Sequence, residues 1–112
     1  MSLKSIKPID LYAKQVAGEE VVVIDVRSLP EFEDFHIEGA ILQPITEFDP
    51  DMTVQYLREL GHKLENVYVT CATGKRASRA CEFLRSANFE NAILIEGGTT
   101  AWDEAGLPIA YG

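Results

Sequence analysis

Short apolar runs alternate with amphipathic stretches along most of this chain. Four runs rich in β-branched and other apolar side chains, typical of buried strands, lie at residues 21–26, 40–42, 67–70 and 92–95. Stretches with apolar residues at helical spacing lie at residues 8–17, 52–60 and 77–87, with a last short helix after Thr99 or Thr100. Residues 29–38 are acidic and irregular, with room for one short helical turn. This alternation predicts an α/β fold in which a mostly parallel sheet carries helices on both faces.

Length and composition indicate a single globular domain. The 112 residues predict one domain, 1–112, and 46% hydrophobic with 25% charged residues is an ordinary globular balance. No apolar run exceeds four residues and Met1–Ser5 leads into no signal-peptide core, so we expect neither a membrane partner nor secretion. Two cysteines, Cys71 and Cys81, are too few for a disulfide framework, which favours a reducing, cytoplasmic location.

Charge is distributed unevenly. The formal net charge is -8 and the pI is near 4.6, which disfavours nucleic acid as a partner. Residues 71–85 are the exception, because they hold four basic side chains and a single acid, Glu82. An electropositive segment in an acidic protein indicates an anion site.

The junction after the third apolar run combines a nucleophile with this positive charge. Cys71 stands where a buried strand is expected to end, Gly74 lies in the short loop that follows, and a helix begins directly afterwards. Helix N-terminal amides, Lys75 and Arg76 would lower the pKa of the thiol and would also hold an anionic substrate. Such a loop suits the transfer of an electrophilic group carried on an anion. The residues alone leave a second interpretation open, in which Cys71 is a buried core thiol.

The spacing of residues in this loop can be compared with two other kinds of anion-binding loop. A nucleotide P-loop needs glycine where Val69 stands and serine or threonine where Arg76 stands, so that motif is excluded. The active loop of cysteine phosphatases has a cysteine and an arginine with five residues between them. In this chain only four residues separate Cys71 from Arg76. The smaller ring should fit a sulfur atom better than a tetrahedral phosphate.

Four motifs together resemble the single-domain rhodanese (sulfurtransferase) family. The family's active loop is a cysteine opening six residues with an inner glycine, as in residues 71–76. Asp25-Val26-Arg27 resembles its strand end, and residues 36–41 resemble its His-Ile-x-Gly-Ala-Ile stretch. Residues 96–102 with 105–108 are similar to its Gly-Gly-x-x-Ala-Trp ending. The motifs occur in the family's order and extend over nearly the whole chain, which implies a rhodanese-like sheet of about five strands.

The resemblance implies a sulfurtransferase of the thiosulfate type. The Cys71 thiolate would take the sulfane sulfur of a small anionic donor, such as thiosulfate or a persulfide, and become a persulfide. Cyanide or a thiol, including a protein thiol, would then accept the sulfur, with no cofactor and no metal. The expected substrate-binding residues are Ala72, Thr73, Gly74, Lys75 and Arg76.

One position departs from the family's pattern. Members that use thiosulfate often carry Arg, Lys or Gln after the cysteine, whereas this chain has Ala72. We therefore expect one polar contact to the donor to be missing, which counts against thiosulfate as the natural donor but not against sulfur transfer.

Other candidate side chains are expected to be structural. Asp25 and Arg27 are expected to form an ion pair that braces the active loop, and His36 to be a structural hydrogen-bonding residue. Cys81 is expected in the core and too far from Cys71 for a disulfide. The acids of residues 31–38 are expected to be a solvated face.

Two rival functions remain at this point. Rhodanese-like domains also occur as regulatory or interaction modules of larger proteins, and the chain would then be an excised part. A cysteine phosphatase or arsenate reductase is the second rival, and the loop length counts against it.

Overall fold

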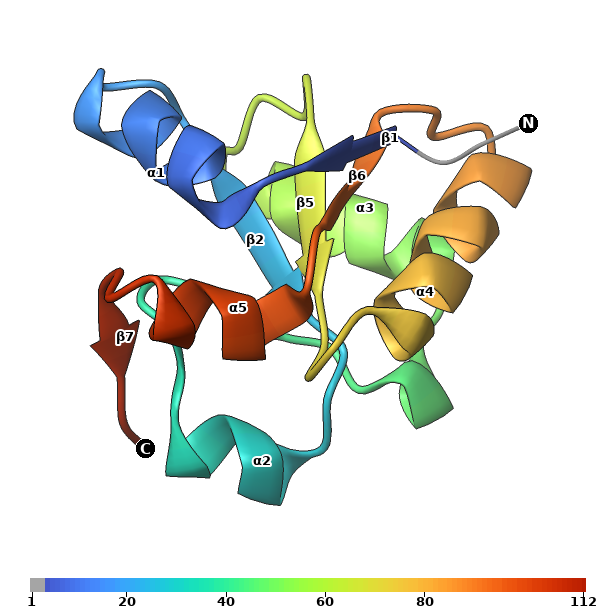
Figure 1. The fold of residues 1–112 in the computed structure, drawn as a ribbon. Helices are drawn as coiled ribbons and strands as arrows, with labels where there is room; N and C mark the ends of the chain where they lie inside the picture. Colours follow the sequence, from blue (N-terminus) through green and yellow to red (C-terminus); the bar gives the residue numbers. More distant parts are fainter. Residues whose placement is uncertain (1–3) are drawn as a thin grey trace.

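A parallel sheet forms the centre of the molecule (Figure 1). The computed structural model describes residues 4–112; residues 1–3, part of the segment in which we expect no signal peptide, lie outside the described residues. Within residues 4–112 five strands form this sheet in the order β1 (Lys4–Ile6), β6 (Ala92–Ile95), β5 (Val67–Thr70), β2 (Val22–Asp25) and β4 (Ile41–Leu42). Every neighbouring pair in it is parallel. The predicted α/β class, with a sheet of about five strands, is confirmed.

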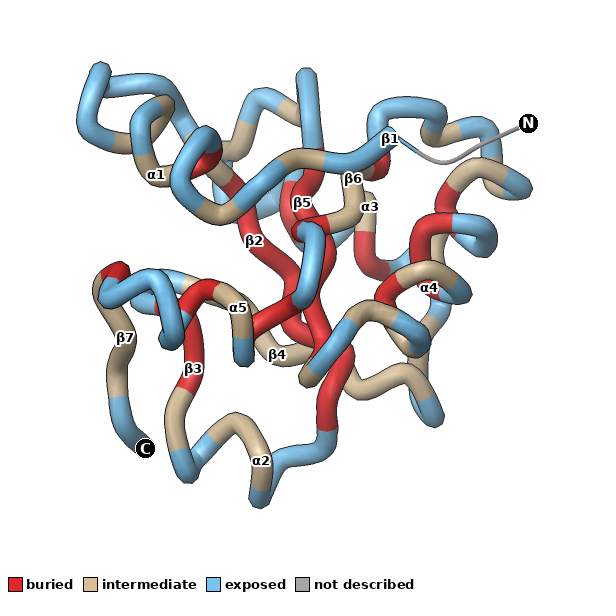
Figure 2. Tube along the Cα trace, in the orientation of Figure 1, coloured by how far each residue is buried: buried red, intermediate tan, exposed pale blue. Residues whose placement is uncertain are grey.

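Helices cover both faces of the sheet. Figure 1 shows α1 (Pro8–Val16) and α5 (Gly98–Glu104) on one face and α3 (Pro50–Glu59) and α4 (Lys75–Ser86) on the other. Successive residues of a strand point to opposite faces, and both faces of β2 are buried accordingly. Val22 and Ile24 join the core beneath α3 and α4, while Val23 joins the core beneath α1 and α5. Figure 2 shows the buried residues concentrated along the central strands.

The second core is anchored by Trp102 of α5. Its side chain is buried, and its ring N–H donates a hydrogen bond to the carbonyl oxygen of Pro108 at 2.7 Å. Tyr12 of α1 meets the Trp102 ring edge-on, with the ring centroids 6.2 Å apart. These contacts fix α5 against the sheet, and α5 in turn packs beside the loop that follows β5.

A second sheet has two strands, which lie side by side in Figure 2. Beyond the short helix α2 (Leu29–Asp34), strand β3 (His36–Ile37) pairs antiparallel with β7 (Ile109–Ala110). The apolar runs did not predict β1, β3 or β7, because β1 and β3 each hold a single apolar residue and β7 is only two residues long. Strand β4 is equally short, but it could be predicted as part of the run 40–42. A 3₁₀ turn at Ile45–Glu47 leads from β4 towards α3.

Two helices begin two residues earlier than their apolar periodicity predicts. Helix α3 starts at Pro50, where the Asp49 carboxylate caps it by accepting from the Met52 amide at 3.1 Å. Helix α4 starts at Lys75, directly after Gly74, whose φ of 125° reverses the chain. Both first turns are polar, so an apolar pattern cannot locate them. Within residues 4–112 no helix has the length and apolar character needed to cross a bilayer.

Candidate active site

The candidate site lies at the carboxyl ends of β2 and β5. Cys71 follows the last residue of β5, and the chain turns through Gly74 into α4. In parallel sheets this edge is where ligands bind, because strand ends and helix N-termini meet there. Figure 1 shows this turn between the start of α4 and the start of α5, with α2 below it.

Two backbone amides point at the sulfur of Cys71. The Gly74 N–H donates to Sγ at 3.0 Å, and the Ala77 N–H donates to it at 3.3 Å. Residues 71–77 therefore wrap around the sulfur, and the dipole of α4 adds partial positive charge. Donors fixed in this way stabilise a negative charge on sulfur, whether on a thiolate or on the atoms of a persulfide. Ala77 lies beyond the range of loop residues expected from the sequence.

Burial alone does not separate the two interpretations of Cys71. The residue is 1% exposed and belongs to the core beneath α4, as a core thiol would. Cys81 is also buried, and burial raises the pKa of its thiol to about 12. Within residues 4–112 the sulfur of Cys81 has no hydrogen-bonding amide, whereas Cys71 has two. The difference lies in the loop geometry, and the role of Cys71 as the reactive thiol stays a prediction.

Helix α5 holds the loop from behind. The Thr99 N–H donates to the Cys71 carbonyl at 2.8 Å, and the Thr100 N–H donates to the Ala72 carbonyl at 3.2 Å. The hydroxyls of Thr70 and Thr99 are 3.0 Å apart. These bonds hold the loop's carbonyl groups toward α5, which leaves its amides free to face the sulfur.

Gly98 is needed for this close approach. A Cβ atom at this position would collide with the Cys71 carbonyl oxygen and lie 2.7 Å from that of Ala72. Its φ of 65° is also a conformation that side chains disfavour. Sequence reasoning used Gly97 and Gly98 as a family motif but did not assign Gly98 this role. A Gly-Gly pair directly before a helix was the available signal.

Arg76 is engaged by a carboxylate. Its Nη1 and Nη2 atoms donate to the two carboxylate oxygens of Glu31 at 2.7 and 3.0 Å. The hydrogen bond from Arg76 lowers the pKa of Glu31 to about 2, and the same bond raises the pKa of Arg76. The interpretation of Glu31 as part of a solvated acidic face is therefore wrong for this residue. The role of Arg76 in donor binding stays a prediction, and it has to take this ion pair into account.

The neighbouring cations are more open. Lys75 and Arg79 are exposed, and Arg79 lies 5.9 Å from the centre of the Phe83 ring. Within residues 4–112 Lys75 makes no ion pair, and its role in binding an anionic donor stays a prediction. Of the other loop residues, Ala72 has a partly buried apolar side chain and Thr73 is exposed.

Asp25 and Arg27 form the expected buried ion pair. Arg27 Nη2 lies 2.9 Å from Asp25 Oδ2, and both side chains are almost completely buried. Arg27 Nη2 also donates to the carbonyl of Phe35 at 2.6 Å, which ties the end of β2 to the segment after α2. Within the described chain this pair makes no hydrogen bond to residues 71–76, so its bracing of the loop stays a prediction.

His36 makes structural contacts. Its Nδ1 is 2.8 Å from the carbonyl oxygen of Phe32, and its ring stacks on that of Phe32 with centroids 3.7 Å apart. Across residues 4–112 no group of three or more His, Cys, Asp or Glu side chains could hold a metal ion.

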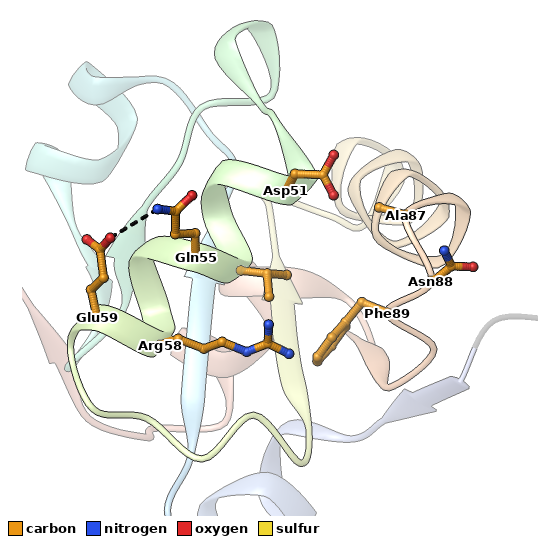
Figure 3. A pocket seen from close by; sticks show the side chains of 8 residues that line it. Asp51, Gln55, Arg58, Glu59, Ala87, Asn88 and Phe89 are labelled. Atoms are coloured by element: carbon orange, nitrogen blue, oxygen red, sulfur yellow. Dashed lines mark hydrogen bonds between the residues drawn. The ribbon is translucent and has the colours of Figure 1, made fainter.

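A cavity lies away from the cysteine. It has a volume of about 670 Å³ and lies between α3 and the chain after α4, where Asp51, Arg58 and Phe89 line it (Figure 3). Gln55 donates to Glu59 at its edge. Helix α4 is 12 residues long, so its two ends are ~18 Å apart at ~1.5 Å per residue. The cavity adjoins the far end of α4 from Cys71 and holds no thiol.

Comparisons with known proteins agree with this geometry. The family model for the rhodanese-like domain matches residues 8–105. The chain belongs to the rhodanese-like domain family, and the resemblance found in the sequence motifs is confirmed. The solution structure of a rhodanese-like domain from Anabaena sp. superposes with a TM-score of 0.79 at 30% identity, covering 100% of this chain and 81% of that one.

Two curated relatives match this chain over different shares of their own length. Thiosulfate sulfurtransferase 16, chloroplastic, of Arabidopsis thaliana is 34% identical over 92 residues, which is 76% of either chain. An uncharacterized protein of Synechocystis sp. is 36% identical over 90 residues, 80% of this chain and 47% of the relative. The chain thus spans only about half the length of this second relative.

Proposed function

We propose that this protein is a sulfurtransferase that works through a persulfide on Cys71. The Cys71 thiolate attacks the outer, sulfane sulfur of an anionic donor such as thiosulfate or a small persulfide. A sulfur–sulfur bond forms, the donor's own sulfur–sulfur bond breaks, and the electron pair leaves with sulfite or with the donor thiolate. A thiol or cyanide then attacks the outer sulfur and releases the Cys71 thiolate again.

The two amides that face Sγ carry this proposal. A persulfide moves the negative charge one atom outward, and the amides of the loop are fixed before the reaction, so their alignment costs no reorganisation. Ala72, Thr73, Gly74 and Lys75 form the donor's binding surface, to which Lys75 brings a full positive charge. Arg76 contributes its charge in competition with Glu31.

The burial of Cys71 restricts the donor. Because the residue is only 1% exposed, a donor has to present its sulfane sulfur as a narrow terminal group. Thiosulfate, a linear persulfide and a persulfide on an extended protein segment all meet this condition. A free thiol of this kind suits a reducing, cytoplasmic location.

The intact mass of the protein tests the proposal. After incubation with thiosulfate, polysulfide or glutathione persulfide, the protein should gain one sulfur atom, and cyanide should remove it. Cys71→Ser should gain none, while Cys81→Ser, the matched control at the other cysteine, should gain sulfur normally. No gain with any of the three donors would overturn the proposal.

The greater length of the Synechocystis relative supports a second candidate function. In a longer protein the domain would serve as a module that binds a partner, and binding would not require the thiol. A partner that binds Cys71→Ala as tightly as the unmodified chain, together with no sulfur uptake, would favour this function.

A further inference from the structure

Glu31 binds Arg76, a cation that the active loop would otherwise present to a donor. Both terminal nitrogens of Arg76 are bonded to the Glu31 carboxylate, which reaches the loop from α2, 45 residues earlier in the chain. The Glu31 side chain is itself held, because its Oε1 accepts from the Ser28 amide at 3.1 Å and from the Ser28 hydroxyl at 3.0 Å. The carboxylate is therefore fixed at the loop by its own helix cap.

We propose that Glu31 sets the charge preference of the site: by engaging Arg76 it disfavours doubly charged donors relative to donors that carry one charge less. The inference rests on the proposed sulfur transfer and names the class of donor for it. A dianion such as thiosulfate has to displace Glu31 from Arg76 or approach beside its negative charge. A singly charged donor has less to gain from Arg76 and meets less repulsion from Glu31.

The location of the pair makes this competition effective. The Arg76 and Glu31 side chains are each about one-third exposed, so a ligand can reach the pair from solvent. Arg76 lies between Gly74 and Ala77, whose amides both bond the sulfur of Cys71, so it belongs to the segment that wraps around the sulfur. Ala72 supplies no polar side chain that could replace the engaged guanidinium. Two features of the loop thus act in the same direction, against a strongly anionic donor.

The substitution Glu31→Gln isolates the charge. Glutamine keeps an oxygen that can accept from the Ser28 amide, as a capping box requires, but it removes the negative charge that holds Arg76. Glu33→Gln is the matched control, because Glu33 is exposed on the same helix and makes no side-chain hydrogen bond or ion pair within residues 4–112.

The first readout compares two donors of similar size. Thiosulfate carries two negative charges, and methanethiosulfonate carries one, because a methyl group replaces a charged oxygen. Glu31→Gln should raise the ratio of kcat/KM for thiosulfate to that for methanethiosulfonate by roughly three- to tenfold. Glu33→Gln should change the ratio by less than about twofold. In an Arg76→Gln background, Glu31→Gln should have no more effect than the control, because it acts through Arg76.

A second readout does not depend on sulfur transfer. Iodoacetate and iodoacetamide alkylate the same thiolate and differ by one charge, so the ratio of their rates at Cys71 reports the charge preference directly. Glu31→Gln should raise the iodoacetate to iodoacetamide ratio, in Cys81→Ser protein so that Cys71 is the single thiol. A changed alkylation ratio without any sulfur uptake would overturn the proposed function and keep the charge preference. Unchanged ratios in both readouts, or a Cys71 that reacts with neither reagent, would overturn the charge preference itself.

Discussion

Gly98 packs against the carbonyl oxygen of Cys71 so closely that no side chain fits between them. This contact brings the first turn of α5 against the loop, where the Thr99 amide bonds the same carbonyl. The orientation of the loop's amides toward the sulfur therefore depends on a residue that carries no functional group.

Gly98→Ala should disrupt the loop. The added Cβ would push Cys71 and Ala72 away from α5, so we expect a stability loss of about 1–3 kcal/mol and at least a tenfold slower sulfur uptake. Gly106→Ala is the matched control, since Gly106 has a similar φ of 74° with open space around its Cα. Urea unfolding and persulfide mass measure the two effects. Equal sulfur uptake by the two variants would contradict the role assigned to the close contact.

Arg27→Met should be strongly destabilising. It leaves the buried carboxylate of Asp25 without its partner and removes the bond to the Phe35 carbonyl, which should cost about 3–5 kcal/mol. Lys14→Met is the control, because Lys14 forms an exposed pair with Glu19 at 3.8 Å, worth less than about 1 kcal/mol. Urea unfolding at neutral pH distinguishes the two. A loss below about 1 kcal/mol for Arg27→Met would show that the buried pair is not a main support of the fold.

The order of the longer strands and helices could be predicted because each of them carries its own local pattern, which the short strands β1, β3 and β7 lack. Residues 67–70 are apolar and β-branched enough to indicate a buried strand, and Gly74 indicates a turn before a helix. The position of Cys71 at the end of that strand followed directly. Local patterns thus place the nucleophile and its loop.

The partners of the loop could not be predicted, because they come from distant parts of the chain. Glu31 is separated from Arg76 by 45 residues. The spacing of Ser28 and Glu31 fits a capping box at a helix start, but it does not show that this acid faces the loop. The position of α2 at the edge of the sheet determines which acid contacts Arg76. The contact of Gly98 with Cys71 is a tertiary contact of the same kind.

The Glu31–Arg76 pair should make stability depend on pH in the acid range. The pKa of Glu31 falls from its ordinary value of 4.5 to about 2 in the folded chain. Between these values the unfolded chain binds more protons, so stability rises with pH. The contribution is present above about pH 5 and is lost as the pH falls toward 2, and because the pair is about one-third exposed it should be less than about 1 kcal/mol.

Urea unfolding of the unmodified chain and of Glu31→Gln measures this contribution. The difference in unfolding free energy between them should be constant from neutral pH down to about pH 5 and should shrink on further acidification to about pH 3. Glu33→Gln should show no such trend. A difference that stays constant with pH would mean that the ion pair does not contribute to stability in solution.

The two cysteines should react differently with alkylating reagents. Burial raises the pKa of Cys81 to about 12, so near pH 8 its thiolate is a very small fraction of the total. Native protein should therefore take up iodoacetamide at Cys71 alone, and Cys71→Ser should take up none until urea unfolds it. The intact mass before and after unfolding measures both. Alkylation of native Cys71→Ser would show that Cys81 is reached without unfolding, and the contrast between a core thiol and a loop thiol would then be lost.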